Sequence, residues 1–484
     1  MLNHSYFRQF FCALLFLCTA LSCAVNPVTG KKQLILLSED QEKAMGLQSD
    51  PEVLASYGAY PDQKLQDFIN QKGKEMAAIS HRPDVGYQFR ILDSPVVNAF
   101  AVPGGFVYFT RGIMAHFNNE AEFAGVLGHE IGHITARHSA QQYSNQMLAQ
   151  LGLMAGMVIS PEFAQFGDLA SQGLGLLFLK FSRDHESQSD ELGVEYSSKI
   201  GYDAHQMAEF FNTIDRLGGG DNGGIPTFLS THPNPANRNK KVDQLATQWQ
   251  QSSRKASTNF KVNRDSYLHM IDGIVYGEDP RQGYVENGIF YHPELKFQFP
   301  VPQSWQFQNM ASQIQMAPEN GKAMMIMTLG GEKSLQEAEQ KISQQQGMKV
   351  QERRNVSVNG LPALAMIVDQ QNEDGSVVRA LLYFIQYDQL IYTFYGLTSA
   401  ADFNNYARFF ESTMTNFKKL TDSSKMNVQP ERIRIQTVKN NGTLAEALRA
   451  FNMPEKRLEE LSILNGMKLK DAVQKGMLIK IISK

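Results

Sequence analysis

The sequence predicts an α+β protein built from more than one domain. Its 484 residues, of which 42% are hydrophobic, suffice for two to four globular domains, and the formal net charge is only −3. Apolar residues recur at helical spacing between about residues 119 and 203, whereas strand patterns dominate from about Gly288 onward. We therefore expect a mainly helical domain with a small sheet, then an α+β domain, then a small terminal module.

The N-terminus has the pattern of a secretory signal. Arg8 precedes an apolar run from Phe10 to Leu21, and these roughly 12 apolar residues are too few to span a bilayer, which needs about 20. The Leu-Ser-Cys ending resembles a bacterial lipoprotein box. That resemblance implies removal of residues 1–22, acylation of Cys23 and, since Ala24 is not Asp, delivery to the outer membrane.

The cysteines agree with export. Cys12 and Cys18 lie inside this signal, so the mature chain keeps at most Cys23 and cannot form an internal disulfide in an oxidising compartment. Acylation explains a lone exported cysteine better than a free thiol does.

A turn and a strand are predicted next. Pro103-Gly104-Gly105 has the composition of a tight turn, and the residues from Phe106 to Thr110 follow it with the pattern of a strand. An ordinary core strand is the plain interpretation of Phe106 and Tyr108.

The stretch VLGHEIGHITARH, residues 126–138, carries the clearest chemical pattern. Histidines four residues apart on a helix lie one turn apart, so His129 and His133 can bind one metal ion with Glu130 beside them. Two imidazole ligands and a carboxylate that accepts a proton from the attacking water form the H-E-x-x-H arrangement of metalloproteases. The same five letters also occur by chance on helices that bind no metal, so the context must decide.

Independent features support this helix. Asn119 and Glu122 have the spacing of a capping box, and an apolar face follows them. Gly125, Gly128 and Gly132 each cost about 1 kcal/mol relative to alanine in a helix. Three such residues indicate that another element packs close to this helix.

A catalytic zinc site needs a third protein ligand. His138 lies about 140° around the helix from His133, so we expect it to face away from the metal and to support a ligand or pack in the core. Residues 182–203 offer two acidic pairs one turn apart, Glu186 with Asp190 and Glu191 with Glu195. One carboxylate of such a pair can bind zinc while the other accepts the free N–H of a ligand histidine. Spacing alone does not choose between the pairs, and a solvated acidic helix face is the plain alternative.

Two apolar stretches lie between these helices, at 147–159 and 174–181. Both are too short to span a membrane. Core helices are one interpretation, and a lid or membrane-facing plug over the site is the other. Farther along, residues 218–224 are almost all turn formers and predict a mobile loop, and THPNPANR follows at 231–238.

Four stretches together resemble a known family, the zinc metallopeptidases that include the CAAX prenyl endopeptidases, the HtpX membrane proteases and the BepA-like periplasmic proteases. The stretches occur in the family's order over roughly residues 26–250: NAFAVPGGFVYFTRGIM (98–114), GVLGHEIGHITARH (125–138), SRDHESQSDELG (182–193) and THPNPANR (231–238). The resemblance implies a zincin-like (gluzincin) domain at 23–255 with one Zn²⁺ per chain. It implies His129, His133 and Glu186 as ligands, Asp190 as the carboxylate behind a ligand, and Glu130 as the catalytic base.

The same resemblance assigns two further sets of residues. The neighbourhood of Phe106, Val107 and Tyr108 would form the sheet edge beside the metal, where an extended substrate can add as a strand. His232 would approach the metal, either at its open position in a resting state or to stabilise the oxyanion, with Arg238 as its support. Without the resemblance, a histidine before proline in a loop is a plain surface residue.

The remaining chain predicts accessory domains. Residues 256–287 are expected as a linker that packs back on the peptidase, and 288–422 as an α+β domain loosely like PsbP, with a binding or scaffolding role. Residues 430–484 predict strand, helix, helix, strand and resemble a LysM module, with Gly442-Thr443 matching its turn. Residues 425–484 contain 12 basic and 6 acidic residues, a net charge of +6, which suits an anionic envelope polymer or surface. Nucleic acid is a poor partner for an exported protein.

Two functions remain open at this point. One is a zinc endopeptidase of the bacterial cell envelope, lipid-anchored in the periplasm, that hydrolyses misfolded or misassembled envelope proteins, with peptidoglycan or an outer-membrane assembly complex as a further partner. The other is a chaperone or assembly factor whose zinc site is latent and gated by His232. A cell-wall hydrolase rests on the terminal module alone.

Overall fold

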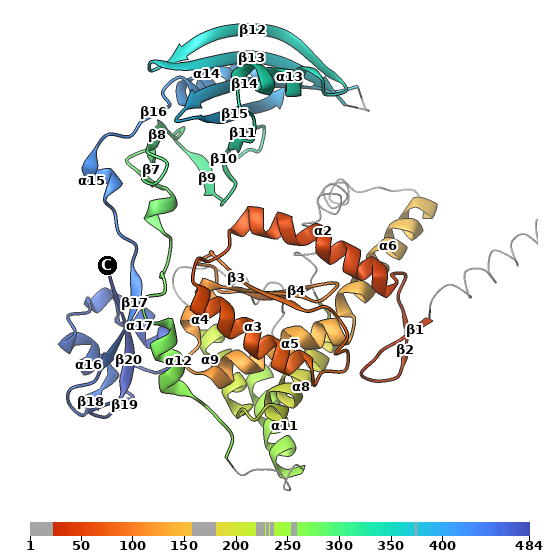
Figure 1. Ribbon diagram of the computed structural model, residues 1–484, viewed down its shortest axis with the longest axis vertical. Helices are drawn as coiled ribbons and strands as arrows, with labels where there is room; N and C mark the ends of the chain where they lie inside the picture. The colour runs from red at the N-terminus through yellow and green to blue at the C-terminus, as the bar shows by residue number, and fades with distance from the viewer. Residues whose placement is uncertain are drawn as a thin grey trace, which may run out of the picture. The chain divides into compact units, whose positions relative to one another are not determined.

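The computed structural model describes residues 23–156, 181–218, 228, 232, 237–252, 259–372 and 375–484. The chain forms two compact units (Figure 1). The first unit holds the residues up to Leu54, Ala59–Gly277 and Arg432–Ser483, and the second holds Ala55–Gly58 and Glu278–Glu431. Both contain helices and sheets, so the predicted α+β class is confirmed.

A three-stranded sheet lies near the start of the first unit. Its strands are β3 (Gln88–Leu92), β4 (Ala99–Val102) and β5 (Phe106–Thr110), in the order β3-β5-β4. Strand β5 pairs in parallel with β3 and antiparallel with β4. Gly104 and Gly105 form the predicted turn, with positive φ angles of 83° and 99° that favour glycine.

The expectation that Phe106, Val107 and Tyr108 form the free sheet edge is wrong. All three lie on β5, the central strand, and are at most 4% exposed. Both sides of β5 are used by neighbouring strands, so no substrate strand can add to it. The edge strand beside helix α5 (Glu120–Thr135) is β4 instead.

Helices build the rest of this unit's peptidase region. Before the sheet come the short hairpin β1 (Cys23–Val25) and β2 (Lys32–Leu34) and the helices α2 (Glu39–Tyr57) and α3 (Gln63–Ala77). After the sheet, the helices are α4 (Arg111–His116), α5, α6 (His138–Gly156), α8 (Arg183–Lys199), α9 (His205–Gly218), α11 (Arg238–Ser252) and α12 (Arg264–Ile271). Residues 157–180 and 219–227 fall outside the described residues, so the predicted lid and the predicted mobile glycine-rich loop lie there.

Helix α5 begins as its sequence predicts and packs as its glycines predict. The Asn119 side chain accepts the Glu122 N–H at 2.8 Å, and the Glu122 carboxylate accepts the Asn118 N–H at 2.7 Å. A Cβ added at Gly128 would lie 3.0 Å from the Cα of Gly193 in α8. The α5 and α8 backbones therefore approach more closely than side chains would permit.

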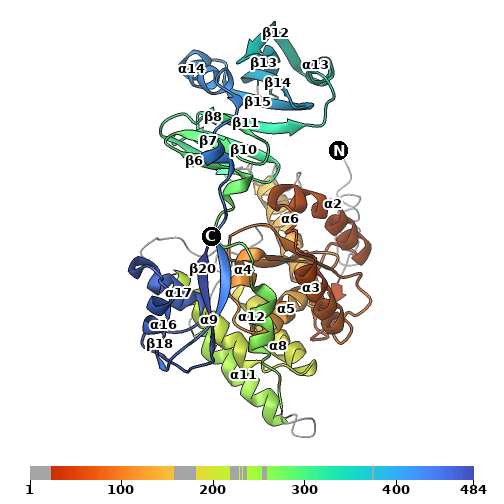
Figure 2. The ribbon, with the colours of Figure 1, turned by 60° about the vertical axis from the view of Figure 1, so that its left-hand side comes forward.

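The C-terminal segment has the predicted strand, helix, helix, strand order, but it is not a separate body. Its elements are β17 (Arg432–Thr437), β18 (Gly442–Thr443), α16 (Leu444–Ala450), η3 (Glu455–Arg457), α17 (Leu458–Leu464), β19 (Ala472–Val473) and β20 (Leu478–Ser483). Strands β17 and β20 pair and lie beside α12 (Figure 2). The segment shares one apolar core with the peptidase helices.

A buried lysine ties this segment to the peptidase helices. Lys480 of β20 is 0% exposed and donates from Nζ to the carbonyl oxygens of Ala115 at 2.8 Å, Phe117 at 2.7 Å and Leu464 at 3.0 Å. Ala115 and Phe117 lie at the connection from α4 to α5. The C-terminal segment therefore belongs to the first unit, with its inner face buried against the peptidase helices.

The second unit is built around a seven-stranded antiparallel sheet. Its order is β12 (Met348–Val358), β13 (Leu361–Gln371), β14 (Val377–Tyr387), β15 (Leu390–Ser399), β11 (Ala323–Gly330), β10 (Gln313–Pro318) and β9 (Trp305–Asn309). Helices α13 (Leu335–Ser343) and α14 (Phe403–Met414) contribute to two separate apolar clusters. A smaller sheet contains β16 (Lys418–Lys419), β8 (Phe297–Pro300), β7 (Ile289–His292) and β6 (Tyr284–Glu286), flanked by η2 (Pro280–Gln282) and α15 (Ser423–Met426).

Within the described parts of the chain, no helix combines the length and apolarity that a membrane span requires.

Candidate metal centre

Helix α5 supplies the first part of the site. His129, Glu130 and His133 lie in its last two turns and are 0%, 0% and 1% exposed. The Nε2 atoms of the two histidines point toward each other at 3.0 Å. One helix turn thus brings two imidazole nitrogens together inside the first unit, as the spacing predicts.

Helix α8 supplies the acidic partner. Glu186 and Asp190, 0% and 1% exposed, face α5, whereas the other candidate pair lies outside the site. Glu191 reaches toward Lys241 at 3.8 Å with a side chain 56% exposed, and Glu195 pairs with Lys199. The structure therefore brings the Glu186–Asp190 pair, and not the Glu191–Glu195 pair, to the histidines.

His232 completes the cluster. Its Nδ1 lies 3.2 Å from His129 Nε2 and 3.0 Å from Glu186 Oε1, and its side chain is buried. Glu186 Oε1 is also 3.4 Å from His133 Nε2. One ligand atom from each of these four residues lies within 4.8 Å of the others.

These separations fit a tetrahedral zinc ion. Zinc binds imidazole nitrogen at about 2.0–2.1 Å and carboxylate oxygen at about 2.0–2.2 Å, which puts neighbouring ligand atoms roughly 3.3 Å apart. His232 Nε2 is buried and has no hydrogen-bond partner among the described residues, and buried Glu186 Oε2 has only the ion pair with Arg238 at 3.2 Å. Two imidazoles, a carboxylate and a third imidazole are a donor set that zinc prefers.

Asp190 and Arg238 hold His129 from behind. Asp190 Oδ1 lies 3.0 Å from His129 Nδ1, so the imidazole donates Nδ1–H and leaves Nε2 for the cluster. Arg238, from the start of α11, donates to Asp190 at 2.7 and 2.9 Å and reaches Glu186 Oε2 at 3.2 Å. Its guanidinium packs over the Phe211 ring at 4.1 Å. The structure thus places Arg238 behind the ligands His129 and Glu186.

His133 is held by His138, in a way that the helical projection did not foresee. Helix α5 ends at Thr135, and Arg137 has a φ of 59°, so the chain turns before α6 begins at His138. The 140° rotation expected from one continuous helix does not apply. His138 Nδ1 lies 3.0 Å from His133 Nδ1, on the side away from the cluster.

Two phenylalanines that the sequence did not single out enclose the imidazoles. Phe181 stacks on His133 with ring centroids 4.1 Å apart, and Phe228 stacks on His232 at 4.7 Å. The only sequence signal for Phe181 is its place at the end of an apolar run, directly before the acidic helix. Both rings exclude water from the ligand side chains.

Burial and mutual charge shift the proton affinities of the site. Burial raises the pKa of Glu130. Burial also acts to raise the pKa of Glu186, but the charges of His232 and Arg238 and hydrogen bonds from His133 hold it well below its usual value. Burial lowers the pKa of His133 well below its usual value. An ionised Glu186 beside a neutral His133 is the state that binds a cation.

The Glu130 carboxylate is available to a bound reactant, because no described protein group hydrogen-bonds to it. Both of its carboxylate oxygens are buried and lack a hydrogen-bond partner among the described residues. Its nearest charged neighbour is His232, whose Nε2 is 3.6 Å from Glu130 Oε1. A buried carboxylate without protein donors beside a metal cluster is poised to exchange a proton with a bound water or substrate.

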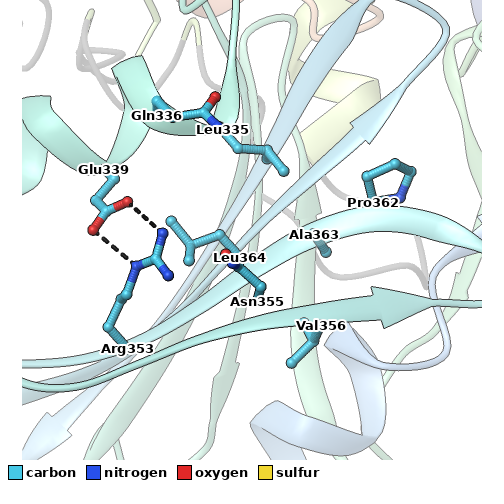
Figure 3. A pocket seen from close by; sticks show the side chains of 9 residues that line it. All are labelled: Leu335, Gln336, Glu339, Arg353, Asn355, Val356, Pro362, Ala363 and Leu364. Atoms are coloured by element: carbon cyan, nitrogen blue, oxygen red, sulfur yellow. Dashed lines mark hydrogen bonds and ion pairs between the residues drawn. The ribbon is translucent and has the colours of Figure 1, made fainter.

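The second unit contains a hollow of about 240 Å³ between α13 and the strands β12 and β13 (Figure 3). Apolar side chains of Leu335, Val356 and Leu364 line it together with Glu339 and Arg353. Glu339 and Arg353 form a doubly hydrogen-bonded pair at 3.0 Å, so their charges neutralise each other. This hollow offers no chemistry comparable to the metal centre.

Comparisons with known proteins agree with the geometry. Residues 63–246 match the family described as Peptidase family M48. The mitochondrial metalloendopeptidase OMA1 of Arabidopsis thaliana is 32% identical over 186 residues, 38% of this chain and 36% of that protein. The beta-barrel assembly-enhancing protease of Yersinia pestis is 27% identical over 267 residues, 52% of each chain, and that of Escherichia coli K12 is 26% identical over 247 residues, 49% of this chain and 50% of that protein.

The chain thus spans about half or less of the length of these relatives. Among solved structures, a cyanobacterial PsbP from Synechocystis covers 28% of this chain and 91% of its own, at 10% identity and a TM-score of 0.23, which carries no argument about the fold.

The family match extends from α3 into α11 and contains both zinc-binding helices, although not the C-terminal segment that shares their core. With this helix pair, this donor set and these relatives, residues 63–246 are those of a zinc metallopeptidase similar to peptidase family M48.

Proposed function

We propose that the protein is a zinc-dependent endopeptidase that cleaves misfolded or misassembled proteins of the bacterial cell envelope. The observation that carries the proposal is the buried cluster of His129, His133 and Glu186 with the unpartnered carboxylate of Glu130 beside it. His129, His133 and Glu186 would hold one zinc ion. When bound, zinc supplies a Lewis acid that polarises a peptide carbonyl and acidifies water.

The chain's own residues divide the remaining work. Glu130 accepts the proton of the attacking water and donates it to the leaving amine, a role for which burial and a raised pKa suit a carboxylate. Asp190 and Arg238 keep His129 in the tautomer that leaves Nε2 for the metal. His232 Nε2, 3.6 Å from Glu130, is placed to donate to an oxyanion once its Nδ1 leaves the cluster.

We propose that an extended substrate pairs with β4. The Thr110 N–H donates to the Asn98 carbonyl, so in this antiparallel pair Asn98, Phe100 and Val102 turn their backbone groups toward β5. Ala99 and Ala101 therefore turn theirs to the outer side, next to α5. No described strand pairs with β4 on that side. Main-chain bonds to this edge would supply affinity with little demand on side chains.

The substrate class and compartment follow from the relatives and the N-terminus. Two of the similar proteins are named beta-barrel assembly-enhancing proteases, and the signal-like N-terminus predicts export. We therefore propose a periplasmic lipoprotein anchored in the outer membrane through Cys23. The basic C-terminal segment, which resembles LysM in its element order, would contact peptidoglycan or another anionic envelope surface, and the second unit would bind a partner of the assembly machinery.

A gated chaperone or assembly factor is the second candidate. The observation that favours it is His232, whose Nδ1 takes the fourth donor position of the tetrahedron. The Phe228 N–H also donates to the Val97 carbonyl at 3.3 Å, directly before the proposed substrate edge. Phe228 thus lies at the start of β4 and His232 lies at the metal site, an arrangement that would keep a resting site closed.

Cleavage of casein by the full mature chain with Cys23→Ser separates the two candidates. We expect cleavage that a chelator abolishes and added zinc restores, and that Glu130→Gln loses while it binds zinc normally. His232→Ala should then cleave faster than the parent if His232 closes the site. Absence of cleavage in the parent, in His232→Ala and in His232→Gln, whose side-chain amide can still donate to an oxyanion, with one zinc bound per chain, would contradict the endopeptidase and favour the chaperone.

A further inference from the structure

The two ligand histidines are supported by chemically different partners. His129 Nδ1 faces the Asp190 carboxylate at 3.0 Å, the arrangement that commonly orients a ligand histidine. His133 Nδ1 instead faces another imidazole, His138 Nδ1, also at 3.0 Å. Both contacts are buried, so water cannot replace either partner.

The direction of the hydrogen bond between His133 and His138 indicates which ring nitrogen of each histidine carries the proton. His133 turns Nε2 toward the cluster, 3.0 Å from His129 Nε2 and 3.4 Å from Glu186 Oε1. To bind a cation there, Nε2 must be free of its proton, so the proton of neutral His133 lies on Nδ1. His133 Nδ1–H then donates to His138 Nδ1, which must itself be unprotonated.

The next residue in the chain of bonds suits that state, and its amide nitrogen, Gln188 Nε2, has no partner among the described residues. If His138 Nδ1 is an acceptor, its own proton lies on Nε2, and His138 Nε2 is 3.0 Å from the amide oxygen of Gln188. An amide oxygen only accepts hydrogen bonds. The Ser189 hydroxyl, 3.3 Å from His138 Nδ1, can donate to the same nitrogen and favours the same tautomer. All bonds therefore run in one direction, from His133 through His138 to Gln188.

The imidazole of His138 is also held mechanically. It begins α6 directly after the turn at Arg137 and is 0% exposed. The His185 ring stacks on it with centroids 4.3 Å apart and an interplanar angle of 18°, and His185 is itself 3.1 Å from the Gln141 amide oxygen. His138 thus has little freedom to turn its nitrogens away from His133.

We propose that His138 and Gln188 are positioning residues that hold His133 in its metal-binding tautomer by a directed, uncharged hydrogen-bond relay. The proposal rests on the zinc site of the proposed function. The support of His129 is different, because the Asp190 carboxylate can only accept a hydrogen bond. The groups behind His133 are uncharged and can donate or accept, so the orientation of the Gln188 amide selects the tautomer. A flipped amide would donate to His138, reverse both bonds and put a proton on His133 Nε2.

Zinc affinity of the full mature chain, measured by competition with a chromogenic chelator, tests the relay without any turnover. His138→Phe keeps a ring against His185 but removes the acceptor, and we expect its zinc affinity to fall 10- to 100-fold. His138→Asn places an amide oxygen near the former Nδ1 and should stay within about threefold of the parent. His269→Phe, the same substitution at an exposed histidine of α12, is the matched control and should bind zinc like the parent.

A second readout reports the tautomer itself. In the zinc-loaded chain with ¹⁵N-labelled histidine, NMR should show the His138 proton on Nε2 and an unprotonated His138 Nδ1, and Gln188→Leu should shift His138 toward a mixture of both tautomers. Melting temperatures of the metal-free variants separate positioning from loss of structure. Parent-like zinc affinity in His138→Phe, or a zinc-loaded parent with His138 protonated on Nδ1, would overturn the relay, whereas failure of the parent to bind zinc would overturn the proposed function instead.

Discussion

Replacing Gly128 with alanine should weaken zinc binding without unfolding the protein. Gly128 lies on α5 directly before His129, where a Cβ would be 3.0 Å from both the Cα and the carbonyl oxygen of Gly193. These are backbone atoms of α8 and cannot yield unless the helix moves. Carbon atoms normally approach to about 3.5–4.0 Å, so α8 must retreat by roughly 0.5 Å.

A shift of this size exceeds the tolerance of zinc–ligand distances, but it is small for the packing of two helices. Glu186 lies two turns along α8 from Gly193, and zinc–ligand distances tolerate only about 0.2 Å. Overpacking costs about 1–3 kcal/mol, whereas alanine stabilises the helix by about 1 kcal/mol relative to glycine. In the metal-free protein the helices can separate, so its free energy of unfolding should change by about 1 kcal/mol or less. Zinc must pull Glu186 back, so the strain should weaken zinc affinity about 5- to 150-fold.

Chelator competition and thermal unfolding with and without zinc measure both quantities. Gly86→Ala is the matched control, because a Cβ added at Gly86 has no atom within 4 Å. The expected result is a metal-free melting temperature close to the parent's and a reduced stabilisation by zinc. If Gly128→Ala kept the parent's zinc affinity while its metal-free form melted much earlier, the close helix contact would serve stability alone.

Three further changes probe buried groups around the site. Arg238→Met leaves the Asp190 carboxylate buried without its cation, so the free energy of unfolding should fall by about 3–5 kcal/mol. Arg238→Lys should recover only part of this loss, because lysine lacks the planar guanidinium fork. Parent-like denaturation of Arg238→Met would contradict this. Burial lowers the pKa of His116 to about 4, so stability from its neutral form is complete above pH 6.5 and lost as pH falls toward 4. Between pH 7 and pH 5 the parent should lose about 2 kcal/mol more than His116→Asn in denaturant titrations, and equal slopes would refute the assignment. Lys480→Met removes three hydrogen bonds to buried carbonyls and should lower the free energy of unfolding by about 2–4 kcal/mol in the same assay. The control, Lys475→Met at an exposed position, should lower it by less than about 0.5 kcal/mol. Similar losses in both variants would show that the buried amine does not add to stability.

Local chemistry predicted the zinc-binding helices well. The Asn119 cap, the histidine spacing and the three glycines of α5 each follow from interactions within a few turns of one helix or from the need for a close neighbour. The choice of Glu186 over Glu191 came from family resemblance, because two acidic pairs at identical spacing differ only in which face of α8 meets α5. The structure shows the difference as burial, 0% exposure for Glu186 against a 56% exposed side chain for Glu191.

The failures share a physical cause, which is that they depend on contacts between distant segments. The sequence of β5 is that of any buried strand, and only its pairing with both β3 and β4 shows that it is not an edge. The docking of β20 depends on Lys480, which composition alone counts as a surface charge.

The charges of the metal centre explain why these contacts are required together. Glu130, Glu186 and Asp190 contribute three buried carboxylates, and Arg238 contributes one buried cation. With neutral histidines and ionised carboxylates the site therefore carries about two negative charges in a region that water does not reach, and a single Zn²⁺ balances them. Without zinc, burial would lower the pKa of His232, but Glu186 and Glu130 outweigh it and raise that pKa, so a protonated His232 offsets part of the excess. The same histidine can thus stabilise the metal-free cluster and serve as a donor to zinc, which ties metal loading to the position of the His232 segment.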